Sequence, residues 1–317
     1  MISFMWKDVI GHTNQKELLK GSIDSGKVPH AFLFCGPEGL GKTKMAREFF
    51  KALNCLQTPG EPCDSCRNCV KAQGLTHPDL IMLGSDGSPI LVGDVREVIS
   101  DTNLKPFEAR KRVIIIEPAE LMNKQSSNAI LKTLEEPPSG TVLILVSHKP
   151  VMLLPTITSR CQIIRFTPLD ASDSSGELLN PVLLRLTSGT LGGLANFDED
   201  DILYIRDQMI GIAGGADPFE LISRYFPPTN TDKDAAMICL LVAESILRDI
   251  LVLKHGGERI ISEELTAMPM NLVNWENIDD LATCIHRIRK GMNENINIRN
   301  AMSELLILFS EIVSARL

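Results

Sequence analysis

The chain has 317 residues, of which 44% are hydrophobic and 23% are charged. This composition is ordinary for a globular protein and excludes a disordered chain, a collagen and a coiled-coil rod. The longest apolar runs, such as residues 141–146, have the length of a strand and fall far short of the roughly 20 residues that cross a bilayer. The N-terminus lacks the basic start and apolar core of a signal peptide, so we expect a cytoplasmic protein with no membrane segment.

The charge is distributed unevenly along the chain. Residues 1–168 hold 20 Lys and Arg against 17 Asp and Glu (net +3), whereas residues 169–317 hold 12 against 23 (net −11). The acidic second part is therefore not expected to bind a phosphate backbone through bulk charge, although the first part could contact one locally.

Apolar strand-like runs alternate with helical patterns in the first 168 residues. The expected strands are residues 31–35, 79–83, 112–117, 141–147 and 162–166, and the expected helices are residues 42–54, 93–102 and 125–136. Fully apolar strands separated by helices indicate a parallel sheet that is covered on both faces. The first part therefore predicts an α/β domain with a parallel five-stranded sheet.

The strand signal ends after Pro168. The polar run Asp170–Gly176 is typical of a linker, and only helical periodicity follows it. The expected helices are residues 178–187, 199–212, 218–225, 234–254, 278–290 and 297–313. Because Pro227-Pro228 separates two helical groups, we expect three domains, at residues 1–168, 169–226 and 227–317.

A glycine-rich loop between the first strand and the following helix carries the strongest functional signal. Residues 36–43 match the pattern G-x-x-x-x-G-K-[ST], in which backbone N–H groups and a helix N-terminus bind phosphates. The lysine would reach the β and γ phosphates and the hydroxyl would ligate Mg²⁺. The alternative is a structural glycine-rich turn. The predicted nucleotide-binding residues of the loop are Gly36, Pro37, Glu38, Gly39, Leu40, Gly41, Lys42 and Thr43.

Nucleotide binding does not imply hydrolysis. A phosphate-loop ATPase usually ends a later strand with Asp, which holds Mg²⁺, and in many families a Glu follows that orients the attacking water. Here the strand ends Glu117-Pro118, and proline has no acid–base function. We therefore expect binding of ATP or ADP with Mg²⁺ but slow turnover.

Four cysteines fall within one short stretch. Cys55, Cys63, Cys66 and Cys69 could supply four thiolates, and Zn²⁺ prefers four tetrahedral ligands. Such a filled coordination shell would be structural rather than catalytic. One alternative is an iron–sulfur cluster, but the fourth cysteine of such a motif is usually followed by proline, and here Cys69 is followed by valine. The other alternative is a set of thiols without a metal. The remaining cysteines at positions 35, 239 and 284 lie in apolar runs and are expected in the core.

Several further motifs give the chain a family resemblance. They are Val9-Ile-Gly-His12, residues 30–37 (His-Ala-Phe-Leu-Phe-Cys-Gly-Pro), residues 128–138 (Asn-Ala-Ile-Leu-Lys-Thr-Leu-Glu-Glu-Pro-Pro) and Ser159-Arg-Cys161. With the cysteine cluster, they make the chain similar to bacterial clamp-loader AAA+ subunits of DNA polymerase III over nearly its whole length. The resemblance implies a RecA-like AAA+ domain, an all-α lid and an all-α collar that closes a pentameric ring.

Two types of subunit within this family compete, the gamma/tau motor and the delta-prime stator. The missing Asp-Glu pair favours the stator. The resemblance also places Gly192 where the motor has a lid arginine, and the chain ends soon after the collar, which is the weakest of the three arguments. The motor remains the alternative, and a steady-state ATPase assay separates the two. A phosphate-loop kinase with the cysteine loop as a lid is a third, unrelated possibility, but that loop lacks the arginines such a lid needs.

The resemblance also implies roles for single residues and partners. Arg160 would act in trans on the ATP of a neighbouring subunit, since a guanidinium can stabilise γ-phosphate charge; otherwise it would form a surface ion pair. Val9 and Ile10 would line the adenine pocket, although both are also expected in the core with Trp6, and Ser147 would stand at the sensor position. The implied partners are gamma/tau and delta subunits, the sliding clamp and, through the assembly, primed DNA.

Overall fold

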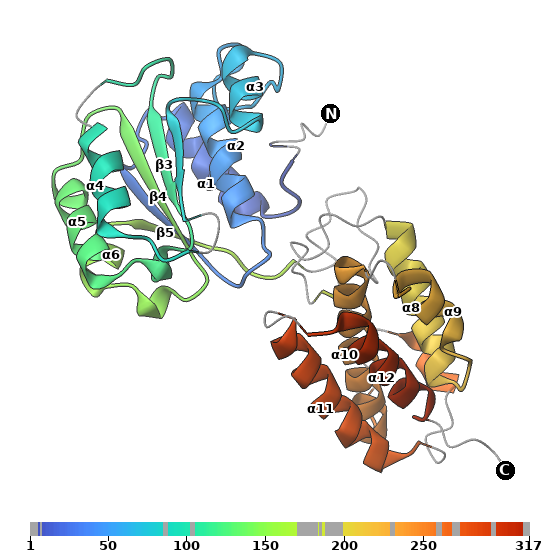
Figure 1. The fold of residues 1–317 in the computed structure, drawn as a ribbon. Coiled ribbons are helices and arrows are strands. Elements are labelled where there is room, and N and C mark those ends of the chain that lie inside the picture. Colours follow the sequence, from blue (N-terminus) through green and yellow to red (C-terminus); the bar gives the residue numbers. More distant parts are fainter. Residues whose placement is uncertain are drawn as a thin grey trace. The chain divides into compact units, whose positions relative to one another are not determined.

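A five-stranded parallel sheet forms the centre of the N-terminal unit in the computed structural model (Figure 1). Its strands lie in the order β2-β3-β4-β1-β5. The strands are β1 (Ala31–Cys35), β2 (Leu80–Leu83), β3 (Arg112–Ile116), β4 (Thr141–Ser147) and β5 (Gln162–Arg165). All five strands expected from the sequence are present, and the prediction of a parallel sheet is confirmed.

Alternate residues of the central strands pack into two different cores. On β1, Phe32 and Phe34 face one side of the sheet, whereas Leu33 and Cys35 face the other. Because successive side chains of a strand point to opposite faces, a wholly apolar strand needs cover on both. Figure 1 shows α1 and α2 over one face and α4, α5 and α6 over the other.

The helices of this unit mostly follow the expected boundaries. They are α1 (Thr13–Asp24), α2 (Lys42–Asn54), α3 (Arg67–Gln73), α4 (Val92–Asp101), α5 (Lys124–Glu135), α6 (Pro155–Thr158) and the 3₁₀ turns η1 (Ala119–Leu121) and η2 (Pro150–Met152). The sequence did not predict α1 and α3. Only Leu19 of α1 is fully buried, so its apolar periodicity is weak, and α3 is only two turns long.

The second unit is helical throughout its described residues. Its elements are α8 (Glu199–Ala213), α9 (Phe219–Tyr225), α10 (Lys233–Lys254), η4 (Glu263–Ala267), α11 (Trp275–Gly291) and α12 (Ile298–Ser310). Three of these helices begin at a side-chain cap, because Asp232, Asn274 and Asn297 accept hydrogen bonds from backbone N–H groups of the first turn. One apolar core includes buried residues from every helix of the unit and is centred on α10.

The chain divides into two compact units, Met1–Leu179 with Gly189–Gly192, and Asn180–Ser188 with Gly193–Leu317. The structure describes residues 6, 8–84, 88–101, 105–169, 183, 186–187, 199–228, 232–257, 262–267, 273–292 and 296–312. The expected linker at 170–176, most of the helix expected at 178–187 and the stretch ending at Gly192 lie outside these residues. The division into three domains at residues 168 and 227 stays a prediction.

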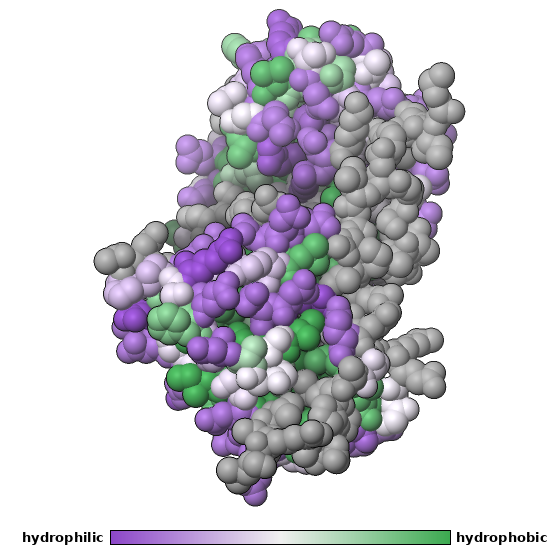
Figure 2. All heavy atoms as spheres, turned by 90° about the vertical axis from the view of Figure 1, so that its right-hand side faces the viewer, coloured by the Kyte–Doolittle hydropathy of each residue, from purple (hydrophilic) through white to green (hydrophobic). Residues whose placement is uncertain are grey.

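The described helices and one face of the surface can be compared with what a membrane-spanning segment requires. Figure 2 shows hydrophilic residues mixed with small groups of apolar ones on the face that it draws. Among the described residues, no helix combines the length and the hydropathy that crossing a bilayer requires.

Candidate nucleotide and metal site

The phosphate loop follows β1 at the carboxyl edge of the sheet and leads directly into α2. Gly39 and Gly41 have φ angles of 77° and 75°, a region that side chains with a Cβ rarely adopt. Gly36 is tight for a second reason, because a Cβ there would lie 2.2 Å from the carbonyl oxygen of Phe166. The glycines therefore give the loop a backbone that other residues could not adopt without strain.

Lys42 lies inside this loop with only 3% of its surface exposed. Its ammonium group donates to the carbonyl oxygens of Gly36, 2.9 Å away, and Pro37. A third contact of 3.0 Å joins it to Nδ1 of His148, which stands just after β4. Because an ammonium has three donors, these three partners can use all of them within the chain.

Carboxylates surround the same ammonium. Burial lowers the pKa of Lys42, and the nearby charges of Glu117, Glu120 and Glu38 oppose this change. The cation needed for phosphate binding is thus balanced by three acidic side chains. Since ATP is itself strongly anionic, these acids would favour a nucleotide that is accompanied by a divalent cation over the free anion.

Glu120 connects the ends of β3 and β4, a role that sequence reasoning missed. Its Oε1 accepts a hydrogen bond of 3.1 Å from the backbone N–H of His148. Burial would raise the pKa of the Glu120 carboxyl. The pKa is nevertheless lowered, because the carboxylate accepts hydrogen bonds from its own backbone N–H, from the buried Ser147 hydroxyl and from the His148 N–H. Glu120 is therefore held as a carboxylate beside the predicted sensor residue. Its position four residues after the end of β3 was the only available signal.

The N-terminal segment contacts the phosphate loop. His12 lies within 2.9 Å of the Leu40 carbonyl oxygen through Nε2 and packs edge-on against Phe166. Val9 is buried, as expected of a core residue, and its carbonyl oxygen accepts from Lys16. Ile10 is 46% exposed, so the expectation that it belongs to the core was wrong. Trp6 and Val9 are buried in the same core and anchor the segment, which leaves Ile10 on the surface.

Arg160 lies away from the chain's own phosphate loop. Arg160 stands just before β5, and the first residue of β5, Gln162, pairs with Phe32 near the start of β1. The phosphate loop follows the other end of β1. The guanidinium donates to the Thr156 carbonyl oxygen and, at 2.9 Å, to Glu135. The Glu135 side chain is 52% exposed, so this ion pair contributes little stability. Arg160 therefore cannot act on a nucleotide bound to its own Lys42.

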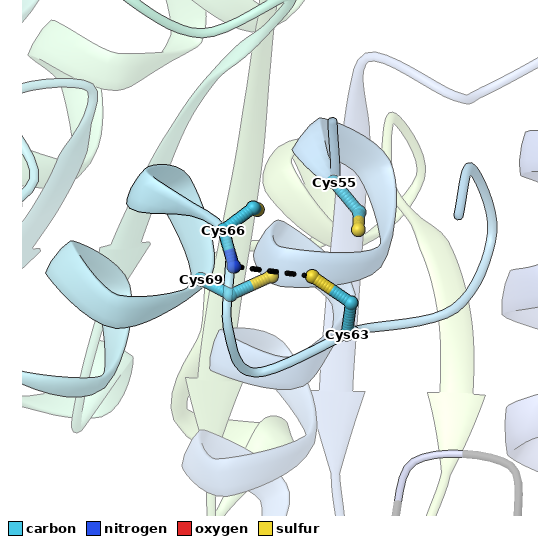
Figure 3. Close-up of side chains that lie close together, drawn as sticks. All are labelled: Cys55, Cys63, Cys66 and Cys69. Carbon is cyan, nitrogen blue, oxygen red and sulfur yellow. Dashed lines mark hydrogen bonds between the residues drawn. The ribbon is translucent and has the colours of Figure 1, made fainter. Parts of the chain in front are cut away.

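The four predicted metal ligands come together between α2 and α3. Cys55 ends α2, Cys66 precedes α3 and Cys69 lies within it, and Figure 3 shows their side chains gathered with that of Cys63. All four sulfur atoms lie within 4.8 Å of one another. Three of them are buried, and the backbone N–H of Cys66 donates to the Cys63 sulfur at 3.2 Å. This donor set fits one tetrahedral zinc ion.

The environment of the thiols differs along the loop. Although burial opposes it, hydrogen bonds from Ser65 and from the N–H of Cys66 lower the pKa of Cys63 to about 6. Burial would raise the pKa of Cys55, but hydrogen bonds from Thr58 lower it. The pKa of Cys69 is raised, both by burial and by the contact of Cys69 with Cys66. The loop thus already stabilises part of the negative charge that a metal ion requires.

His77 and the remaining cysteines are also of residue types that bind metal ions, but they do not belong to the cluster. His77 is buried against Phe50 and accepts from the backbone N–H of Asp79 through Nδ1, and it is not part of the group formed by the four sulfurs. The expectation that Cys35, Cys239 and Cys284 are buried is confirmed. The cysteines of the chain thus fall into a clustered set and a core set, apart from Cys161.

The sheet order, the loop after β1 and the helix that it begins define the class of RecA-like phosphate-loop domains of the AAA+ type. The family described as DNA polymerase III, delta subunit, matches residues 11–170, which is half of the chain, and the chain therefore belongs to this family.

Relatives extend the similarity beyond that region. A DNA polymerase III subunit delta′ from Bacillus subtilis (strain 168) is 28% identical over 314 residues, covering 93% of this chain and 95% of the relative. A subunit delta′ from Pseudomonas aeruginosa is 40% identical over 154 residues, which are 47% of this chain and 46% of that one. A subunit tau from Escherichia coli (strain K12) is 29% identical, over 83% of this chain but 42% of its own length.

A solved structure supports the fold. A gamma subunit-related protein from Thermotoga maritima superposes with a TM-score of 0.50 at 19% identity, covering 94% of this chain and 99% of the other. At that identity the likeness shows the fold alone. The expectation of an AAA+ fold with a helical C-terminal part is thereby confirmed.

Proposed function

We propose that this chain acts as the delta-prime, or stator, subunit of a bacterial DNA polymerase III clamp loader and helps to load the sliding clamp onto primed DNA. Its partners would be gamma/tau and delta subunits in a pentameric ring. The observation that carries the proposal is an intact phosphate loop facing an incomplete catalytic edge. Lys42 is in place, but Glu117 stands where Mg²⁺ is usually held by Asp, and Pro118 stands where a Glu would orient water.

In this proposal the loop of residues 36–43 binds ATP or ADP with Mg²⁺, Val9 and Ile10 border the adenine, and Ser147 stands at the γ-phosphate end. The side chain of Ile10 is 46% exposed, which supports an adenine contact because an exposed apolar side chain is accessible to a ligand. A zinc ion held by Cys55, Cys63, Cys66 and Cys69 would have a structural role. Arg160 would serve the ATP of an adjacent motor subunit.

The test separates binding from turnover. Isothermal titration should give measurable binding of Mg-ATP to the wild-type chain, and Lys42→Ala should abolish it because the phosphates lose their cation. The control Lys132→Ala changes an exposed lysine on α5 and should bind normally. Absence of binding by the wild type would contradict the nucleotide site.

A steady-state ATPase assay decides between the stator and the gamma/tau motor. We expect turnover far below about 1 s⁻¹, the low end of ordinary enzymes. Turnover at that rate or faster by the isolated chain would favour the motor, despite the proline at position 118.

A further inference from the structure

A buried lysine joins the cysteine loop to the rest of the N-terminal unit. The side chain of Lys51, on α2, is 1% exposed. Its ammonium lies 2.7 Å from Glu48 on the same helix and 2.5 Å from Asp64, which stands between Cys63 and Cys66. It also lies 3.4 Å from Asp8 in the N-terminal segment and 3.3 Å from Gln73 at the end of α3.

The ammonium occupies the centre of an acidic cluster. Oxygen atoms of Asp8, Glu48 and Asp64 lie within 4.8 Å of one another, a spacing that by itself suits a cation. Lys51 already supplies that cation, so the cluster is an ion network rather than a second metal site. Without the lysine, three carboxylates would repel one another in a partly buried place, which is strongly unfavourable.

Two further contacts run from the cysteine loop to the N-terminal residues. The indole N–H of Trp6 donates to the carbonyl oxygen of Gly60 at 3.3 Å, and Lys20 of α1 forms an ion pair with Glu61. Gly60 and Glu61 of the loop therefore contact Trp6 and Lys20 directly, and Asp64 is linked to Asp8 through Lys51. The loop fixes the course of the N-terminal segment at separate points.

The same segment reaches the phosphate loop. From Trp6 and Asp8 the chain runs through Val9 to His12, whose ring contacts the Leu40 carbonyl oxygen. Lys51 also lies on the helix that begins with Lys42. The cysteine loop and the phosphate loop are thus connected both by a rigid helix and by a segment whose position depends on loop contacts.

We infer that Lys51 is a positioning residue through which metal binding at the cysteine loop and nucleotide binding at the phosphate loop are coupled. This inference rests on the proposed function. A zinc ion would order residues 55–69, and the ordered loop holds Asp8 and Trp6 in place, so that the nucleotide no longer has to order them itself. Because coupling between two binding equilibria is reciprocal, nucleotide must raise zinc affinity by the same factor.

The first experiment measures both directions of the coupling. Mg-ADP affinity is determined by titration for the full chain loaded with zinc and for the chain freed of zinc by a chelator. We expect zinc to tighten Mg-ADP binding about 5-fold or more, and Mg-ADP to tighten zinc by the same factor in a competition with a chromogenic chelator. Equal ADP affinities with and without zinc would overturn the coupling while leaving the proposed nucleotide site intact.

The second experiment uses zinc-loaded variants and so does not depend on a folded metal-free chain. Lys51→Met and Asp64→Asn should still bind one zinc, yet bind Mg-ADP several-fold more weakly and show faster hydrogen exchange at residues 6–12. Lys132→Met, an exposed lysine on α5, is the matched control and should behave as wild type. Wild-type ADP affinity and wild-type exchange in both variants would overturn the role of Lys51. Failure of the zinc-loaded wild type to bind any nucleotide would instead overturn the proposed nucleotide site, and the coupling with it.

Discussion

At the scale of single residues, Lys42 shows how the chain fills its own phosphate site. Its three donors are used by two loop carbonyls and by His148. A nucleotide must replace at least one of these acceptors with phosphate oxygens. His148 is the only side chain among the three and can rotate away, whereas the carbonyls belong to the loop backbone.

We therefore predict that His148→Ala tightens nucleotide binding. The variant removes a competitor for the Lys42 ammonium, and a hydrogen bond to a charged group contributes about 1.5 kcal/mol, or roughly tenfold in affinity. Titration with Mg-ADP measures the effect, with the exposed neighbour Lys149→Ala as the control. Weaker binding would instead show that His148 contacts the nucleotide itself.

A second residue-scale prediction concerns Asp79, whose side chain is fully buried. Although burial opposes it, the backbone N–H groups of Ala109, Glu108 and Phe107 and the charge of Arg112 lower the pKa of this carboxyl. A carboxyl whose pKa is lower in the folded than in the unfolded chain stabilises the fold at pH values above the unfolded pKa of about 3.9. This stabilisation is lost as the pH falls through the folded pKa. Asp79→Asn should lower the free energy of unfolding by about 2 kcal/mol at pH 7.

The difference in the free energy of unfolding between Asp79→Asn and wild type should become smaller below pH 4, because protonation of Asp79 then removes the same interactions from the wild type. Urea unfolding in a Trp275→Phe background reports on the N-terminal unit, because Trp6 is then the remaining tryptophan. Glu97→Gln, an exposed acid on α4, is the control. A constant difference across this pH range would show that the carboxylate charge is not responsible.

At the scale of elements, the cysteine loop joins the end of α2 to the start of α3. Cys55 stands at one helix end, and Cys66 and Cys69 at the other. A metal ion would therefore fix the position of α3, a helix too short to be stable through its own hydrogen bonds. The free energy of metal binding would contribute directly to the folding of this loop.

We predict one zinc and no iron per chain by elemental analysis. Cys66→Ser should lower the zinc content and destabilise the loop, because the coordination shell loses one of its four thiolates. The variant should keep α2 and the phosphate loop formed, as judged by residual Mg-ADP binding. Cys161→Ser lies outside the cluster and should retain the metal; unchanged zinc in Cys66→Ser would refute the ligand assignment.

At the scale of the whole molecule, the sheet separates Arg160 from the chain's own phosphate loop. The parallel sheet puts the chain's own phosphate loop at the carboxyl edge and Arg160 at the amino edge. Its ion pair with Glu135 is half exposed and stabilises the chain by less than about 1 kcal/mol. The arginine can therefore leave Glu135 for a partner's phosphate at small cost.

We predict that Arg160→Ala leaves folding and nucleotide binding of the isolated chain unchanged but slows the assembled clamp loader. In the proposed role, the variant would delete a charge-assisted contact to the γ-phosphate on a neighbouring subunit. The measurement is the DNA- and clamp-stimulated ATPase of a reconstituted complex, together with clamp loading onto primed DNA. Glu135→Ala, which removes only the local ion pair, is the control. Full ATPase and full loading with Arg160→Ala would reduce this residue to a surface ion pair.

The sequence by itself determined the features whose signal is local. The apolar runs of β1, β3 and β4 are each wholly buried, and their short length and the turn residues next to them favour strands over buried helix segments. The spacing of residues 36–43 predicted the glycine-rich loop, and the spacing of the four cysteines predicted that their thiols come together, because each set lies within a short stretch of chain. The helices with strong periodicity were found with boundaries within a few residues.

Only the tertiary structure decided which distant residues meet. Lys42 contacts a histidine 106 positions away, and Lys51 gathers acids from two other segments. Ile10 is exposed although its neighbour Val9 is buried. These outcomes depend on the order of the strands and on which helix covers which face. A charged side chain finds its partner through the folded arrangement, and no spacing along the chain records that choice.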